Sequence, residues 1–187
     1  MEVNDYVYRT NILPKELCEI IIDVIKQRDW QKHEWYSIQS NNRSSHETKE
    51  LDVQNVDNDL QNKLTPFIIE AGKEYNKKYA DANNDKMSQL FFTMSPVRFN
   101  RYEKGTVMRK HYDHIRSLFD GERKGIPVLS ILGVLNDDYE GGEFLVNDRD
   151  FNLKQGDIIL FPSCFMYPHE VKEVTKGTRY SFISWAF

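Results

Sequence analysis

The feature that most constrains the fold is a series of short apolar runs that begins near Leu90 and continues to Phe187. These runs are rich in β-branched and aromatic residues, and Gly, Asn, Asp and Pro separate them. In order they are LFFTMSPVRFNRY, VLSILGVLN, GEFLVN, DIILFP, HEVKEV and TRYSFISWAF. Short strands with turn residues between them are typical of a β-sandwich or barrel. Residues 90–187 are therefore expected to form a β-rich core.

Two amphipathic patterns in the first half of the sequence predict helices. The first follows Pro14, which suits the first turn of a helix, and the second precedes a polar break at ADANNDKMSQ. The apolar positions are Leu17, Ile20, Ile21, Val24 and Ile25 in the first pattern, and Leu60, Leu64, Phe67, Ile68, Ala71 and Tyr75 in the second. Because helices precede strands and 187 residues suit one core, we expect a single α+β domain over residues 1–187. Residues 1–89 would be mainly supporting helices and loops.

Charge and composition narrow the classes of partner. The net charge is −4 and the basic residues are scattered, so no nucleic-acid partner is expected. No apolar run is long enough to span a membrane, and no basic segment followed by an apolar one indicates a secretory signal. We therefore expect a cytoplasmic protein without a membrane partner, in which Cys18 and Cys164 are reduced and structural. The oligomeric state is not predictable from these features.

The segment KHYDH, residues 110–114, places three potential metal ligands close together. In an extended segment residues i and i+2 point to the same side, so His111 and Asp113 should project together, and His114 should not join them. A third ligand must come from elsewhere, and His169, which opens a predicted strand, is the candidate. Two histidines and one carboxylate form the facial triad that leaves open positions on non-haem Fe(II). The alternative is a chance HxD tripeptide and a surface histidine.

Arg179 follows His169 by ten residues and opens the apolar run of the last predicted strand. A guanidinium presents a rigid fork that matches a carboxylate. On an inward-facing strand such a side chain requires an anionic partner. On an edge strand it would be an ordinary surface arginine.

Four segments together resemble a known family: RYEKGTVMRKHYD, VLSILGVLNDDYEGGEFLV, GDIILFPS and PHEVKEVTKGTRYSFISWAF. They are similar to the double-stranded β-helix, a jelly-roll or cupin-like fold, of the Fe(II)/2-oxoglutarate-dependent oxygenases, and in particular to the prolyl 4-hydroxylase-like group. The resemblance covers Pro96 to Phe187, and the predicted helices precede it as supporting helices do in that group. It implies a dioxygenase that needs Fe(II), 2-oxoglutarate as cosubstrate and O2, with ascorbate as a supporting reductant. It also implies hydroxylation of an unactivated C–H bond, with release of succinate and CO2.

The resemblance implies a role for each matching residue. His111, Asp113 and His169 match the iron ligands and thus the catalytic centre. Arg179 matches the residue that pairs with the distal carboxylate of 2-oxoglutarate. Tyr102 matches a tyrosine that hydrogen-bonds this cosubstrate.

Two further matches have an equally good explanation in core packing. Ser130 stands where the group has a threonine near the cosubstrate, and Trp185 matches a tryptophan on the wall of the substrate pocket. Gly141 and Gly142 are more simply explained as a tight turn than as chemistry.

The substrate implied by the resemblance is a prolyl or other side chain in a peptide or protein. One departure stands against it: Pro127 occupies the position where prolyl hydroxylases have a peptide-holding arginine. Arg123 is the candidate replacement as a substrate-binding residue, together with its neighbour Lys124. The alternative substrate is a free amino acid or other small metabolite, whose carboxylate Arg116, Arg123 or Lys124 would bind.

Two other classes of function remain open at this point. A non-catalytic β-helix module would bind a small carboxylate or a partner, and a cupin-like metalloenzyme would have no need of Arg179. For an oxygenase, the polar segments 37–50 and 115–125 are candidate lids, since both lack core-forming residues.

Overall fold

The computed structural model describes residues 2–37, 42–44, 49–79, 93–113 and 126–187. Within them the chain forms a short 3₁₀ helix (Val3–Tyr6) and two α-helices, α1 (Lys15–Ile25) and α2 (Asn58–Tyr79). The strands are β1 (Tyr8–Asn11), β2 (Gln31–Lys32), β3 (Trp35–Ser37), β4 (Asn42–Ser44), β5 (Asp52–Asn55), β6 (Arg98–Tyr102), β7 (Met108–His111), β8 (Leu129–Val134), β9 (Glu140–Gly141), β10 (Phe144–Val146), β11 (Arg149–Asp150), β12 (Asp157–Pro162), β13 (His169–Val171), β14 (Val174–Lys176) and β15 (Arg179–Ala186). A search of these residues finds no helix with the length and apolar character needed to cross a membrane.

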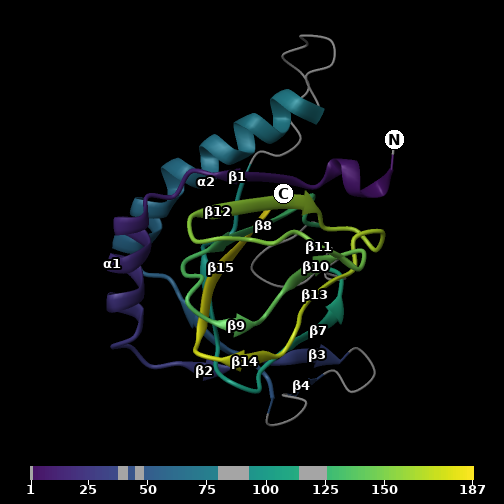
Figure 1. The fold of residues 1–187 in the computed structure, drawn as a ribbon. Coiled ribbons are helices and arrows are strands. Elements are labelled where there is room, and N and C mark those ends of the chain that lie inside the picture. Colours follow the sequence, from purple (N-terminus) through teal and green to yellow (C-terminus); the bar gives the residue numbers. More distant parts are fainter. Residues whose placement is uncertain (1, 38–41, 45–48, 80–92, 114–125) are drawn as a thin grey trace.

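Two antiparallel sheets face each other across a core. The larger has the order β1-β12-β8-β15-β6-β5-β2, and the smaller has the order β11-β10-β13-β7. Strands distant in sequence are neighbours in both, as when β8 lies between β12 and β15. Figure 1 shows the resulting barrel-like arrangement. This is the double-stranded β-helix that the sequence resemblance implied, and the α+β fold class is confirmed.

The central strands are continuous apolar runs in the sequence because both of their faces are buried. All six residues of β8 are buried, because both faces of this strand are covered. Ile131 and Leu129 face one core, and Leu132 and Val134 face the other. The period of two therefore assigns each side chain to a layer.

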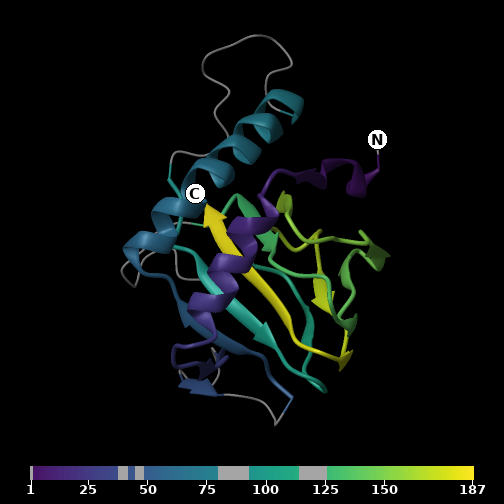
Figure 2. The ribbon, with the colours of Figure 1, turned by 60° about the vertical axis from the view of Figure 1, so that its left-hand side comes forward.

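The first core lies between the larger sheet and the two helices. It joins the apolar face of α1, including Ile21 and Ile25, to that of α2, including Leu64 and Ile68, and to strand residues such as Phe182. Figures 1 and 2 show both helices on the same face of this sheet, with α1 crossing in front of β15 in Figure 2. Both predicted helices are therefore present and play the supporting role expected of them.

The second core fills the space between the two sheets. Tyr102, Phe161 and Ile183 of the larger sheet meet Phe144 and Val171 of the smaller one. Arg179 opens β15 on this inner face, because it shares the alternation of Ser181 and Ile183. The polar residues on the inner faces of these strands thus lie next to the inner core.

The first half of the chain contributes more strands than expected. We predicted mainly helices and loops for residues 1–89, yet β1 pairs with β12, and β5 pairs with β6 at an edge of the larger sheet. The polar segment 37–50 also contains β4, which pairs with β3. These strands have two to four residues each, too short for a pattern of alternation to be recognised.

Candidate metal centre

Pairing between β7 and β13 brings two of the predicted ligands together. His111 and His169 are direct partners across these antiparallel strands, and their ring centroids are 4.3 Å apart. A register irregularity follows between His169 and Val171. The two imidazoles therefore leave the smaller sheet side by side.

Asp113 completes the group two residues after His111. Its Oδ1 lies 3.4 Å from His111 Nε2, and its Oδ2 lies 3.6 Å from His169 Nε2. The three ligand atoms all lie within 4.8 Å of one another. In the described part of the chain this is the one group of three His, Cys, Asp or Glu side chains that gathers in this way. His114 lies outside the described residues.

Each imidazole is oriented by a backbone carbonyl. His111 Nδ1 lies 2.7 Å from the Arg109 carbonyl oxygen, and His169 Nδ1 lies 3.1 Å from that of Tyr167. A carbonyl oxygen only accepts hydrogen bonds, so each Nδ1 must carry the proton. Both Nε2 atoms are then lone-pair donors aimed toward Asp113, which is the arrangement that a metal ion requires.

The protonation states also suit a cation. Burial lowers the pKa of His169 to about 4, so the ring is neutral near pH 7. Burial alone would raise the pKa of Asp113, but His169, His111 and the Ser130 hydroxyl outweigh it and hold this pKa below its usual value. Two imidazoles and one carboxylate fit Fe(II), which prefers such mixed nitrogen and oxygen ligands.

Ser130 and Trp185 both contact Asp113 directly. The Ser130 hydroxyl donates to Asp113 Oδ2 at 2.6 Å, and the Trp185 indole N–H donates to the same oxygen at 2.9 Å. The sequence had suggested places near the cosubstrate for Ser130 and on the substrate-pocket wall for Trp185. Those roles stay predictions. In the structure, both residues hold the carboxylate ligand by hydrogen bonds.

Arg179 is fully buried on the inner face of β15. Its Nη1 donates to Ser181 at 2.9 Å, whereas Nε and Nη2 are buried and have no hydrogen-bond partner among the described residues. Tyr102 of β6 is paired with Arg179 in the sheet, and its ring faces the guanidinium, with Arg179 Cζ 5.0 Å from the ring centroid. A buried guanidinium with two free N–H groups costs stability unless an anion completes it. The expectation that Arg179 faces inward is therefore met.

The predicted Gly141–Gly142 turn makes room for this arginine. Both glycines have positive φ, 74° and 66°, which other residues adopt only with strain. A Cβ on Gly142 would lie 3.2 Å from Arg179 Cδ. The turn therefore serves the site through the space that it leaves beside the Arg179 stem.

Several residues next to the triad were missed from the sequence. Phe161 packs edge-on against His169, with ring centroids 4.8 Å apart, and its place on the inner face of β12 follows from the alternation of that strand. Trp35 packs edge-on against His111 at 5.2 Å and donates its indole N–H to buried Glu50 at 3.0 Å. Arg109 donates to the same Glu50 oxygen at 3.0 Å. No sequence pattern indicates that Trp35 lies here.

Two further residues with metal-binding or reactive side chains, His33 and Cys18, do not belong to this centre. His33 is buried beside Trp35, with ring centroids 4.8 Å apart, and is not a member of the triad. Cys18 is buried, and burial raises its pKa to about 11, as suits a structural thiol. Arg123, Lys124 and Arg116 lie outside the described residues, as do His46 and most of both candidate lid segments.

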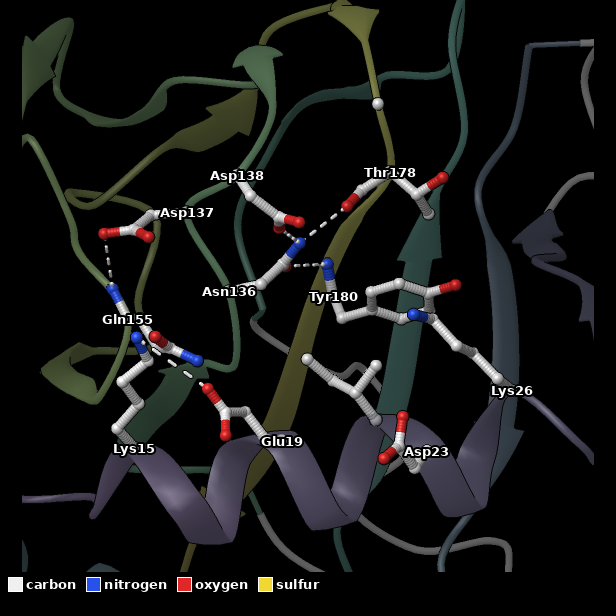
Figure 3. Close-up of a pocket in the computed structure, with 12 residues that line it drawn as sticks. Lys15, Glu19, Asp23, Lys26, Asn136, Asp137, Asp138, Gln155, Thr178 and Tyr180 are labelled. Atoms are coloured by element: carbon white, nitrogen blue, oxygen red, sulfur yellow. Dashed lines mark hydrogen bonds and ion pairs between the residues drawn. The ribbon is translucent and has the colours of Figure 1, made fainter.

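A polar cavity of about 590 Å³ lies beside α1 (Figure 3). Its polar groups bond to one another: Asn136 donates to Asp138 and to the Thr178 carbonyl and accepts from the Tyr180 N–H. None of the triad residues lines it. This cavity is therefore not part of the metal centre.

Comparison with known families places the triad in context. A family model described as the 2OG-Fe(II) oxygenase superfamily matches residues 97–187, the segment that carries all three triad residues and Arg179. Residues 97–187 are therefore similar to the 2OG-Fe(II) oxygenase superfamily. The name of this superfamily states the metal and the cosubstrate. The two imidazoles and the carboxylate suit the metal, and the unpartnered nitrogens of Arg179 suit the cosubstrate.

Curated relatives resemble the same part of this chain. A PKHD-type hydroxylase of Idiomarina loihiensis is 40% identical over 93 residues, which are 48% of this chain and 40% of that relative. Another, from Delftia acidovorans, is 36% identical over 99 residues, which are 48% of this chain and 42% of that relative. The chain therefore spans less than half the length of these relatives.

Solved structures extend the similarity in fold to nearly the whole chain. A prolyl-4-hydroxylase of Pseudomonas putida superposes with a TM-score of 0.67 at 18% identity, covering 96% of this chain and 91% of that one. A prolyl hydroxylase from Trichoplax adhaerens, solved with a hypoxia inducible factor peptide fragment, gives 0.70 at 15% identity, covering 97% and 83%. The fold is thus shared by both halves of the chain, including the supporting helices.

Proposed function

We propose that this chain is an Fe(II)- and 2-oxoglutarate-dependent dioxygenase that hydroxylates an unactivated C–H bond. The observation that carries the proposal is the gathering of His111, Asp113 and His169, with both Nε2 atoms free to bind a metal. Fe(II) and 2-oxoglutarate, when bound with O2, supply the oxidative chemistry that yields succinate, CO2 and a hydroxylated product. The protein's own residues bind, orient and shield the reactants.

The triad residues would hold the metal from one side. His111 and His169 come from paired strands, and Asp113 is held by Ser130 and Trp185, so all three ligands are positioned before a metal binds. Such positioning by neighbouring hydrogen bonds is typical of metal sites in proteins. Phe161 and Phe144 cover His169 and limit access of water to that side.

Arg179 would bind the distal carboxylate of 2-oxoglutarate. Its two unpartnered N–H groups supply charge-assisted donors on the inner face of the barrel, and Tyr102 lies beside them. Burial raises the pKa of Tyr102, so its hydroxyl keeps its proton and can donate a hydrogen bond.

For the substrate, we propose a side chain within a peptide or protein, with proline as the leading candidate. The structural neighbours include prolyl hydroxylases, one of which was solved with a peptide fragment. The alternative is a free amino acid or another small metabolite. A cytoplasmic location remains a prediction of the sequence.

Incubation with Fe(II), ascorbate and 2-oxoglutarate tests both levels of the proposal. A library of peptides, half of them containing proline, should yield succinate, and the proline-containing members should gain the mass of one oxygen. Oxidation of free amino acids alone would retain the dioxygenase and exclude the prolyl substrate. Failure to form succinate with any substrate, in protein that binds iron, would favour a non-catalytic binding module.

A further inference from the structure

A second interior guanidinium lies near the metal centre without a carboxylate partner. Arg98 is partly buried on β6, and its Nε donates to Asn100 at 3.2 Å. Among the described residues, no carboxylate forms an ion pair with it, whereas Arg28, Arg101 and Arg109 pair with Asp57, Asp52 and Glu50. The Asp113 carboxylate attracts the Arg98 charge without forming an ion pair with it, so the half-buried guanidinium has donors left for the anionic group of a ligand.

Contacts link Arg98 to the triad through one side chain. Its guanidinium lies over the Trp185 ring, with Cζ 5.4 Å from the centroid, and the Trp185 indole N–H is bonded to Asp113. A charge in this position lies next to the metal centre and not on the outer surface of the sheet. It can therefore act on a molecule bound beside the metal.

Arg98 does not lie in the place proposed for the cosubstrate. Tyr102 pairs with Arg179, whereas Arg98 pairs with Ile183, four residues away along both strands. Four residues of an extended strand span about 13 Å. The two arginines therefore start from separate backbone positions on the paired strands, and the Arg98 charge also acts on Tyr102.

Arg98 also lines a cavity with room for a substrate. The cavity has a volume of about 710 Å³, and His33, Gln54 and Asn55 line it with Arg98. Through Trp35, which contacts both rings, His33 adjoins the metal ligand His111. Nε2 of buried Gln54 donates hydrogen bonds to two backbone carbonyls, and its Oε1 has no hydrogen-bond partner among the described residues. No triad residue lines the cavity, but two of its lining residues contact a neighbour of the triad: His33 contacts Trp35, and Arg98 contacts Trp185.

The lining of the cavity holds both signs of charge, so an anionic group would bind at a particular cation and not to the cavity as a whole. Asp29 and Glu34 line the cavity as exposed residues, and Lys32 is already paired with Asp52 at 2.7 Å. Arg98 is the lining cation that adjoins the metal centre and lacks an ion pair within the described ranges. A guanidinium binds a carboxylate through a fork of parallel hydrogen bonds.

We propose that Arg98 binds a carboxylate of the substrate in this cavity and so places the oxidised carbon beside the metal. The inference rests on the proposed dioxygenase function. The carboxylate is that of a free amino acid, or belongs to the C-terminus or an acidic side chain of a peptide. Both sources present the same group to Arg98.

Matched acid and amide probes test this inference. One panel holds free L-amino acids and their primary amides, and the other holds proline-containing peptides with Glu or Gln beside the proline and with a free or amidated C-terminus. Binding is measured by isothermal titration without O2, in the presence of Fe(II) and 2-oxoglutarate, and succinate is measured in air. The panel that shows a preference identifies the source of the carboxylate.

The wild-type protein should bind at least one acid about tenfold or more tightly than its amide, as expected for a charge-assisted contact. Arg98→Gln should remove this preference, and Arg98→Lys should retain part of it. Arg101→Gln is the control: it changes the same strand, and Asp52 keeps its ion pair with Lys32. That control should leave the preference unchanged.

Two results would overturn the inference. One is a wild-type protein that prefers no acid over its amide in either panel. The other is an Arg98→Gln variant that loses affinity for acid and amide equally, which would show that Arg98 acts by supporting Trp185. Succinate formation without an acid preference would refute this inference alone, whereas lack of succinate with every probe would refute the dioxygenase function.

Discussion

At the scale of single residues, Asp113 is the metal-centre residue whose carboxylate two other side chains hold by hydrogen bonds. It receives hydrogen bonds from Ser130 and Trp185 and lies within 3.6 Å of both imidazoles. Its side chain is only 8% exposed. An anion held in this way is costly to bury alone, so the site is built to be completed by a cation.

Alanine substitution of any triad residue should abolish turnover. His111→Ala, Asp113→Ala and His169→Ala each remove one of three ligands, and Fe(II) affinity should fall more than about 100-fold, beyond the range usual for loss of a supporting hydrogen bond. His33→Gln is the control, because His33 contacts Trp35 and lies outside the triad. Its Fe(II) affinity, measured by anaerobic titration, should stay within a few-fold of wild type. Wild-type affinity in any triad variant would contradict the assignment.

Removing the hydrogen bonds to Asp113 should weaken the metal site without destroying it. Trp185→Phe keeps a flat apolar ring but removes the N–H, and Ser130→Ala removes the hydroxyl. Each should lower Fe(II) affinity by about tenfold. If Trp185→Phe left metal affinity intact and raised only the KM for substrate, Trp185 would be a pocket wall and not a support of Asp113.

Ligand types were predictable from the sequence because coordination demands particular side chains at particular spacing. His111 and Asp113 are two residues apart on an extended segment, and His169 opens the neighbouring strand. The contacts of Trp35 and Glu50 were not predictable, since they depend on where a short strand from the first half comes to lie. No local pattern encodes that placement.

At the scale of elements, β8 and β15 are packed tightly against each other on the face of the larger sheet that the helices cover. A Cβ on Gly133 of β8 would lie 2.1 Å from Phe182 Cε1 of β15. The glycine therefore allows the aromatic ring to lie flat against the strand, under α1 and α2. This close contact joins two neighbouring strands of the larger sheet.

Gly133→Ala should lower the free energy of unfolding by about 1–3 kcal/mol, since the added methyl group must displace a buried ring. Chemical denaturation followed by circular dichroism measures the loss. The same substitution in a Phe182→Leu background should cost less, because the smaller side chain leaves space. Equal costs in both backgrounds would show that the strain lies in the β8 backbone and not in the contact with Phe182.

Long apolar elements were predictable, and short ones were not. The runs VLSILGVLN, DIILFP and TRYSFISWAF correspond to β8, β12 and β15, whose two buried faces make them continuous in sequence. β1 and β5 have four residues each, and their edges are stabilised by pairing with β12 and β6. Their existence depends on those partners more than on their own residues.

At the scale of the whole molecule, similarity in sequence and similarity in fold cover different parts of the chain. The family match begins at residue 97, whereas the superposition on the Pseudomonas putida prolyl-4-hydroxylase covers 96% of the chain. The second half must retain particular ligand residues. The first half supplies apolar faces to the larger sheet, a task that many sequences can perform.

The central claim is that one chain binds Fe(II) through the triad and 2-oxoglutarate through Arg179. Anaerobic isothermal titration of 2-oxoglutarate into Fe(II)-loaded protein tests it most directly. The account predicts binding of one 2-oxoglutarate per chain, lost on chelation of the metal or in His169→Ala, weakened about tenfold or more in Arg179→Ala, and weakened less in Tyr102→Phe. Iron binding should be nearly intact in Arg179→Ala. Binding that is insensitive both to chelation and to Arg179→Ala would contradict the account.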